Sequence, residues 1–159
     1  MSGSDMFADL RDLYQEVILD HGRKPRNFRR LLDANRTARG DNPMCGDRME
    51  LFVALGADGA IADAAFQGRG CAISMASASL MTETIKGKTQ EQAREMGRKF
   101  RALAMTGTCP ACGGAIAEDM ERLAPLSGVH EFPSRVKCAT LAWHTLGAAL
   151  DGAKEASSE

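Results

Sequence analysis

Hydrophobic residues recur at helical spacing near the start of the chain, and the set comprises Met6, Phe7, Leu10, Leu13, Tyr14, Val17 and Ile18. This spacing predicts an amphipathic helix, and Gly22 offers a stop just beyond it. Lys24 then precedes Pro25, and a residue before proline is biased away from helix. The helix is therefore followed by an extended turn.

A two-residue alternation replaces the helical pattern further along. Met49, Leu51, Val53 and Leu55 take every second position, which is typical of a strand with one buried face. Asp58-Gly59 is a turn signal, and apolar residues return from Ile61 to Gln67. The pattern predicts a β-hairpin over Arg48–Gln67 that runs into the glycine-rich corner Gly68-Arg69-Gly70-Cys71.

Helical patterns fill the rest of the chain, and four helices are predicted: Ile73–Ile85, Thr89 to about Met105, Ala115–Leu123, and Pro133–Leu150. The pair Thr89 and Gln92 has the spacing of a capping box, and Pro133 suits a first helical turn. The order of elements predicts one α+β domain over residues 1–159: an N-terminal helix, a small antiparallel sheet, then several helices packed on it. We expect the tail at 154–159 to be disordered.

Composition agrees with a globular domain, since 44% of the 159 residues are hydrophobic and 26% are charged. A net charge of −1 argues against a protein that mainly holds nucleic acid. Seven basic residues nevertheless lie between Gly22 and Arg39, against Asp33 alone. This segment is either a solvated loop or a docking patch for an acidic partner protein. RNA binding ranks third, because Phe28 is the segment's only aromatic residue.

The sequence predicts a cytoplasmic protein without a membrane segment. No apolar run reaches the roughly 20 residues that a spanning helix needs. The first ten residues carry Asp5 and Asp9 and lack the pattern of a signal peptide. Five cysteines, an odd number, are a poor disulfide framework in a reducing compartment. Metal ligation or thiol chemistry is therefore the better hypothesis.

Three cysteines fall at boundaries between predicted elements. Cys45-Gly46-Asp47 occupies the loop that enters the hairpin, where glycine lets two ligand-type residues face one point. Cys71 follows the second strand and begins a helix, and Cys138 lies near the start of the last helix. A thiol at a helix N-terminus is favoured as thiolate. Basic residues near these cysteines would offset the charge of such a site, namely Arg48, Arg69, Arg135 and Lys137.

The residues alone leave two interpretations open. In the first, the three cysteines and Asp47 form a shared metal site. In the second, Cys71 and Cys138 are small buried residues that act as part of the hydrophobic core. The Cys-Gly-Asp turn weakens the second interpretation, because an aspartate beside a strand start is a poor core residue.

Longer segments carry a resemblance to a known family, and they are Leu13–His21, Lys24–Asn27, Asn42–Asp47, Gly68–Ser79 and Phe132–Leu141. In order and content they resemble the signature blocks of the U-type iron–sulfur cluster assembly proteins, the family of IscU and the NifU N-terminal domain. The resemblance spans about Leu13 to Leu150. Two features make the chain more similar to the SufU branch than to the IscU branch. Lys137 stands before the last cysteine, where the IscU branch has histidine, and the gap between Cys71 and Cys138 is wide.

The resemblance implies a zinc-dependent sulfur acceptor whose ligands are Cys45, Asp47, Cys71 and Cys138. In this family the donor is a PLP-dependent cysteine desulfurase of the SufS type, and the sulfur passes to downstream iron–sulfur assembly proteins. We expect Cys45 to accept the persulfide sulfur and Arg135 to steady the outgoing thiolate or persulfide. The protein would then be a sulfurtransferase-like carrier that works with the desulfurase, rather than an independent enzyme.

Two other functions remain open at this point. The same thiolates would serve a scaffold that binds iron and on which an iron–sulfur cluster is assembled and transferred. A purely structural zinc domain would use them without any transfer chemistry.

Cys109-Pro110-Ala111-Cys112 departs from the family pattern. A decorated surface loop is the first interpretation, followed by a labile disulfide and by a second metal shared between subunits. The histidines are not expected to be ligands. His21 lies at a helix end with a partner contact left open, His130 lies in a surface loop, and His144 lies on another face of the Cys138 helix.

Overall fold

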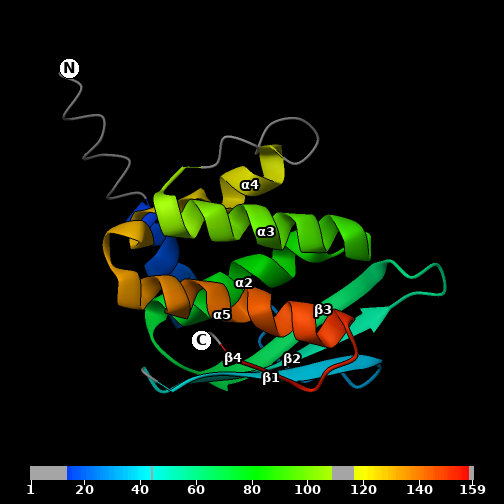
Figure 1. Ribbon diagram of the computed structural model, residues 1–159. Helices are drawn as coiled ribbons and strands as arrows, with labels where there is room; N and C mark the ends of the chain where they lie inside the picture. The colour runs from blue at the N-terminus through cyan, green and yellow to red at the C-terminus, as the bar shows by residue number, and fades with distance from the viewer. Residues whose placement is uncertain (1–13, 44, 109–116, 158–159) are drawn as a thin grey trace.

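The computed structural model describes residues 14–43, 45–108 and 117–157. Its helices lie over one face of a four-stranded sheet, as Figure 1 shows. Residues 14–23 are helical, so the described part of the N-terminal helix is confirmed, while residues 6–13 of the prediction lie outside the described residues. The α+β class is confirmed as well.

The sheet has the order β3-β2-β1-β4. β2 (Asp47–Leu55) and β3 (Ile61–Arg69) form the predicted hairpin. β1 (Arg36–Asn42) pairs antiparallel with β2 and was not predicted. Its inward positions hold small or polar residues, Ala38, Gly40 and Asn42, so the strand shows no hydrophobic alternation. At Gly40 a Cβ would collide with Thr145, which shows how closely α5 approaches β1.

The C-terminal tail corrects one expectation. Residues 154–159 were predicted to be disordered, but Glu155–Ser157 form β4, which pairs parallel with β1. The backbone N–H of Arg39 also donates to the Lys154 carbonyl at 2.8 Å. The cause is the open edge of β1, whose backbone groups need partners. Residues 158–159 lie outside the described residues.

The four predicted helices are present in order, as α2 (Ala72–Ile85), α3 (Gln90–Thr106), α4 (Ala117–Leu123) and α5 (Pro133–Leu150), and a 3-10 helix (Ala124–Glu131) lies between α4 and α5. The capping box is confirmed, since the Thr89 hydroxyl accepts from the Gln92 N–H at 3.0 Å and the Gln92 side chain accepts from the Thr89 N–H at 2.9 Å. The 3-10 helix was not predicted. None of the described helices is both long and apolar enough to cross a membrane.

The hydrophobic core lies between the inner face of the sheet and the helices. α2 and α5 pack on the sheet, and α3 lies on their far side (Figure 1). Fully buried side chains from both layers meet there, among them Leu51, Val53, Phe66, Met81, Phe100 and Leu141. This packing fixes the N-terminal ends of α2 and α5 beside the loop between β1 and β2.

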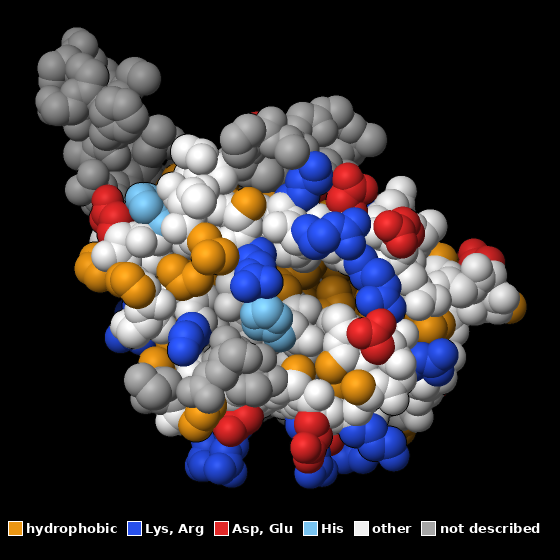
Figure 2. Space-filling view, viewed as in Figure 1, with side chains coloured by type: hydrophobic (Ala, Val, Ile, Leu, Met, Phe, Trp, Pro, Cys, Tyr) orange, Lys and Arg blue, Asp and Glu red, His pale blue; other side chains and the backbone are white. Residues whose placement is uncertain are grey.

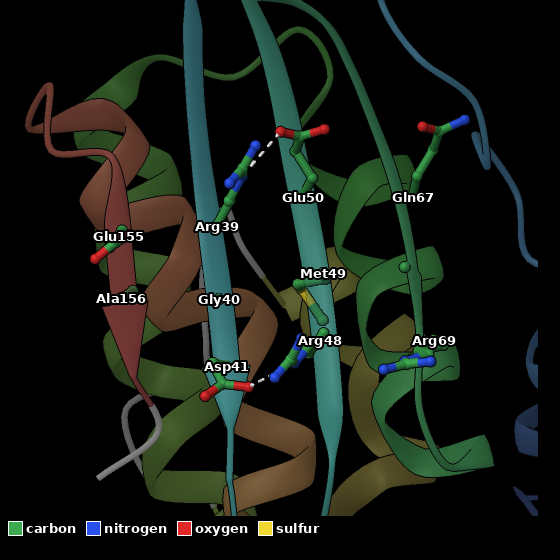
Figure 3. Close-up of a pocket in the computed structure, with 11 residues that line it drawn as sticks. Arg39, Gly40, Asp41, Arg48, Met49, Glu50, Gln67, Arg69, Glu155 and Ala156 are labelled. Atoms are coloured by element: carbon green, nitrogen blue, oxygen red, sulfur yellow. Dashed lines mark hydrogen bonds and ion pairs between the residues drawn. The ribbon is translucent and has the colours of Figure 1, made fainter.

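The outer face of the sheet is divided into two halves. Leu31 covers Phe52, Ala54 and Ala65 in a small second cluster. The other half is an open hollow lined by charged side chains, which Figure 3 shows with two ion pairs, Arg39–Glu50 at 3.3 Å and Arg48–Asp41 at 3.5 Å.

The basic segment from Gly22 to Arg39 is partly engaged within the protein. Arg26 pairs with Asp20, and Arg29 pairs with Asp63 at 2.9 Å. Arg30 lies over the Phe52 ring at 5.6 Å. The segment is thus more than a solvated loop, and the docking patch for an acidic partner stays a prediction.

Candidate metal and thiol site

A tight hairpin loop presents the first two candidate residues. Asn42 and Asp47 are directly paired at the ends of β1 and β2, and residues 43–46 connect them. The Cys45 N–H donates to the Asn42 carbonyl at 3.2 Å, and Gly46 adopts a left-handed φ of 70° that glycine accepts without strain. Cys45 is consequently exposed on the loop, while Asp47 points inward and is fully buried.

Three ligand-type atoms meet at this loop. The sulfurs of Cys45 and Cys138 and a carboxylate oxygen of Asp47 all lie within 4.8 Å of one another. The two sulfurs are 3.5 Å apart, although the residues are separated by 93 positions in the chain. The fold therefore brings together three of the four residues that the resemblance implies.

The Asp47 carboxylate is held on two sides. The Cys71 N–H donates to Oδ1 at 3.0 Å, and the Asn42 side-chain amide donates to Oδ2 at 3.4 Å. Gly70 leaves the space that the carboxylate fills, because a Cβ there would stand 2.6 Å from Oδ1. The orientation of this oxygen ligand is thus set by three neighbouring residues.

Cys71 lies beside the cluster, but its sulfur lies outside it. The residue caps the N-terminus of α2, and its Sγ accepts from the Ser74 N–H at 3.5 Å. Its charge raises the pKa of Cys138, which shows that the two thiols are close enough to interact. To become a ligand, the Cys71 sulfur would have to move closer to the three atoms of the cluster.

Cys138 is a buried thiol rather than a helix-stabilised thiolate. It lies in the second turn of α5, beyond the first-turn N–H groups that favour a thiolate. Burial raises its pKa most, followed by hydrogen bonds with Asp47 and Cys45. The expectation that a helix N-terminus favours the thiolate is therefore wrong for Cys138. A bound cation would favour the thiolate form of Cys138.

Arg135 is a cation that lies at the cysteines. The charge of Cys71 and a hydrogen bond to Cys138 raise the pKa of its guanidinium. Arg48 and Arg69, which were expected to offset the charge of the site, instead line the outer face of the sheet (Figure 3). Arg48 directly follows Asp47, so strand alternation points it to the opposite side. Arg69 is paired with Arg48 across β2 and β3 and therefore shares its face.

Sequence reasoning missed Asn42. Its side chain is fully buried, and its Nδ2 reaches both Asp47 Oδ2 at 3.4 Å and Cys138 Sγ at 3.6 Å. Its Oδ1 is buried without a hydrogen-bond partner among the described residues. The available signal was its position directly before Pro43, at the start of the loop that carries Cys45.

The donor set suits a zinc ion. Two thiolates and a carboxylate are common zinc ligands, and tetrahedral Zn–S bonds of about 2.3 Å place two sulfurs about 3.8 Å apart. The observed separation of 3.5 Å is close to that value. The space that Gly70 leaves for Asp47 also preserves the oxygen ligand. These residues therefore fit the metal that the resemblance implies.

The histidines lie apart from this cluster. His21 is buried, with Nδ1 2.7 Å from the Ser79 hydroxyl, and the His130 ring nitrogen Nδ1 donates to the Ser127 carbonyl at 2.7 Å. His144 lines a groove between α3 and α5, where Figure 2 shows basic side chains around a hollow. Cys109 and Cys112 lie outside the described residues.

Comparison with known proteins identifies related chains over almost the whole length. The model of the NifU-like N-terminal domain family matches residues 13–154. The zinc-dependent sulfurtransferase SufU of Bacillus subtilis is 44% identical over 139 residues, which cover 87% of this chain and 90% of that protein. The iron–sulfur cluster assembly scaffold protein IscU of Streptococcus pyogenes is 36% identical over 143 residues, which cover 90% of this chain and 86% of that protein.

A solved structure agrees with these sequence comparisons. The crystal structure of an iron–sulfur cluster assembly scaffold protein for the SUF system from Fervidobacterium islandicum superposes with a TM-score of 0.75 at 32% identity. The superposed region covers 85% of this chain and 94% of the chain in that crystal structure.

Proposed function

This chain belongs to the NifU-like N-terminal domain family, and from that premise we propose that it accepts persulfide sulfur at a zinc site for iron–sulfur cluster assembly. The zinc-dependent sulfurtransferase SufU, to which it is 44% identical, is the relative that favours this chemistry. The observation that carries the proposal is the exposed Cys45 sulfur, 3.5 Å from the buried Cys138 sulfur and beside Asp47.

The ligand set in this proposal is Cys45, Asp47, Cys71 and Cys138. The first, second and fourth already lie within 4.8 Å of one another. Cys71 is the remaining candidate, because its backbone is bound to Asp47 and its charge acts on Cys138. When bound, zinc would keep these thiols deprotonated and protected until a sulfur donor arrives.

Cys45 is the acceptor in this proposal because it alone among the three described cysteines is exposed. Its thiolate attacks the outer sulfur of the donor's Cys–S–SH group. The new S–S bond forms as the donor's S–S bond breaks, and the donor's cysteine leaves as a thiolate, so charge and electrons balance without an oxidant. Arg135 lies where its guanidinium would stabilise a thiolate or persulfide at Cys71 or Cys138.

The donor would be a PLP-dependent cysteine desulfurase of the SufS type, and the sulfur would pass on to iron–sulfur assembly proteins. Support for such a donor comes from the position of Cys45 on an exposed loop, where a persulfide carried by another protein can reach it. Buried Cys138 offers no comparable access.

The direct test is mass spectrometry of the zinc-loaded protein after incubation with a cysteine desulfurase and cysteine. We expect added sulfur on Cys45 in the natural protein and none on the Cys45→Ser variant. A Lys154→Ala variant, altered at the far end of the chain, is the matched control. Absence of sulfur on Cys45, or an equal amount on the Cys45→Ser variant, would contradict the proposal.

A cluster scaffold is the second candidate, favoured by the 36% identity to an IscU scaffold protein over 90% of this chain. Thiolates bind iron–sulfur clusters as well as zinc. Anaerobic incubation with iron and sulfide separates the two functions. A brown protein with visible absorbance that passes its cluster to an apo-acceptor supports the scaffold, whereas a colourless protein that retains zinc supports sulfur acceptance.

A further inference from the structure

The buried Asn42 side chain connects two members of the candidate ligand set. Its Nδ2 group lies 3.4 Å from Asp47 Oδ2 and 3.6 Å from Cys138 Sγ, so one amide group donates to two ligand atoms. These atoms come from β2 in the sheet and from α5 in the helical layer that packs on it. The side chain therefore holds the carboxylate of one element to the sulfur of another.

Asn42 contacts Cys45 through its backbone and not through its side chain. The Cys45 N–H donates to the Asn42 carbonyl at 3.2 Å. The Cys45 sulfur is exposed and approaches the Cys138 sulfur instead. The amide thus supports the two buried ligands and leaves the exposed one unsupported.

The Asn42 side chain is not needed to close the hairpin. The loop is closed by the backbone hydrogen bond from Cys45, by the paired strand ends and by the left-handed Gly46. Moreover, Oδ1 is buried without a partner among the described residues, which destabilises the folded chain. The two contacts of Nδ2 are therefore the interactions that this side chain contributes among the described residues.

We propose that Asn42 is a positioning residue that holds Asp47 and Cys138 in the ligand set and thereby directs ligand exchange to Cys45. The inference rests on the proposed function. An N–H donor directed at a thiolate withdraws electron density from the sulfur, which makes it a weaker nucleophile. The same contact restrains the side chain, so the sulfur stays in the ligand set. Cys138 receives this donor and Cys45 does not, so Cys45 is the sulfur that is released to react.

Two substitutions remove the donors while nearly keeping the size of the side chain. Asn42→Leu is uncharged, and Asn42→Asp is charged, so an effect common to both follows from loss of the N–H groups. Asn35→Leu is the matched control, because Asn35 bonds Leu55 through both side-chain atoms at the opposite end of the same strand pair.

The first measurement is zinc affinity by chelator competition. We expect both Asn42 variants to bind zinc about 10- to 100-fold more weakly than the natural protein, the usual effect of losing a group that supports a metal ligand. The Asn35→Leu control should bind as the natural protein does. Unchanged affinity in both Asn42 variants would overturn the inference.

The second measurement reports on the sulfur itself. In the cobalt-substituted protein, loss of the N–H···S bond should shift the sulfur-to-cobalt charge-transfer band to longer wavelength, since the thiolate becomes more electron-rich. A merely structural role would weaken the band without moving it. A band that keeps its position in both Asn42 variants would contradict the inference even if affinity falls.

The third measurement asks which sulfur reacts. Limited alkylation of the zinc-loaded protein, mapped by peptide mass, should modify Cys45 in the natural protein and both Cys45 and Cys138 in the Asn42 variants. If Cys45 were the only one of the three candidate ligand cysteines to be modified in every variant, the directing role would be contradicted. If the natural protein itself binds no zinc, the proposed function fails; if it binds zinc and the variants match it, only the role of Asn42 fails.

Discussion

Asp47 occupies the space that a side chain at position 70 would need, since a Cβ on Gly70 would lie 2.6 Å from its Oδ1 and 3.1 Å from its Cγ. The two residues belong to different segments, one at the start of β2 and the other just after β3. Their close approach allows the neighbouring Cys71 N–H to reach the same carboxylate at 3.0 Å. The glycine-rich corner is therefore part of the site.

Replacing Gly70 with alanine should displace Asp47. Because the added methyl group meets a buried carboxylate, we expect the free energy of unfolding to fall by about 1–3 kcal/mol and zinc affinity to fall with it. Urea unfolding of the metal-free protein and chelator competition measure the two effects. Gly147→Ala is the control, since nothing lies within 4 Å of its Cβ position in α5 and alanine there should stabilise the helix by about 0.5–1 kcal/mol. Natural zinc affinity in Gly70→Ala would refute the role of this contact.

Substitution of Asp47 should loosen zinc before it disturbs the fold. Asp47→Asn keeps the size and one oxygen acceptor for the Cys71 N–H, but it removes the ligand charge. We expect zinc affinity to fall by at least about tenfold, or ~1.4 kcal/mol, in chelator competition. Asp47→Ala should lose its zinc under the same challenge. Full zinc occupancy in Asp47→Ala would show that this carboxylate is not a ligand.

Arg135 should matter for sulfur acceptance more than for zinc binding. Its guanidinium interacts with Cys71 and Cys138 and is otherwise exposed. Because the guanidinium is exposed, solvent screens its interaction to about 0.2–1 kcal/mol, so Arg135→Ala should slow sulfur transfer by a few-fold (about 1.5- to 5-fold) while retaining zinc. Arg122→Ala, at an exposed arginine in α4, is the control. Equal rates for the two variants in a timed persulfide assay would remove Arg135 from the mechanism.

The elements predicted correctly are those whose sequence pattern is also their packing pattern. The alternation from Met49 to Leu55 is the inward face of β2, and the Thr89–Gln92 pair is a formed capping box. β1 was missed because α5 packs so closely on it that its inward positions hold Ala38, Gly40 and Asn42. No hydrophobic alternation remains where a neighbouring helix leaves room only for small side chains.

The candidate site was likewise predicted where it depends on local sequence and missed where it depends on contacts between separate elements. Cys45-Gly46-Asp47 was visible as a local turn, and its left-handed glycine is present. The support from Asn42 and Gly70 depends on contacts between separate elements, which spacing along the chain does not reveal. The orientation of Cys71 toward Ser74 is likewise set by the helix cap. The full four-residue ligand set stays a prediction.

His21 should make stability depend on pH. Burial lowers its pKa below 6.5, and its Nδ1 lies 2.7 Å from the Ser79 hydroxyl. Since the unfolded chain binds this proton more readily, stability is fully present above pH 6.5 and is lost as the pH falls through the lower pKa of the folded protein.

Urea unfolding of the reduced, metal-free protein at pH 7.5 and pH 5.5 measures this effect (both values chosen to lie about one unit from the ordinary histidine pKa). His21→Asn keeps a hydrogen-bonding atom near Ser79 but cannot be protonated, so its stability should change less between the two conditions. The same loss of stability in both proteins would assign the pH dependence to other groups.

The pairing of Asn42 with Asp47 restricts how the chain can vary at this loop. Side chains alternate between the two faces of a strand, so shifting β2 by one residue against β1 would turn Asp47 outward and carry the Arg48 guanidinium among the sulfurs. An insertion or deletion between positions 43 and 46 that shifted this pairing would replace an anionic ligand with a cation. The length of the loop is therefore fixed by chemistry, and a sequence that keeps every cysteine but changes this spacing would no longer encode the site.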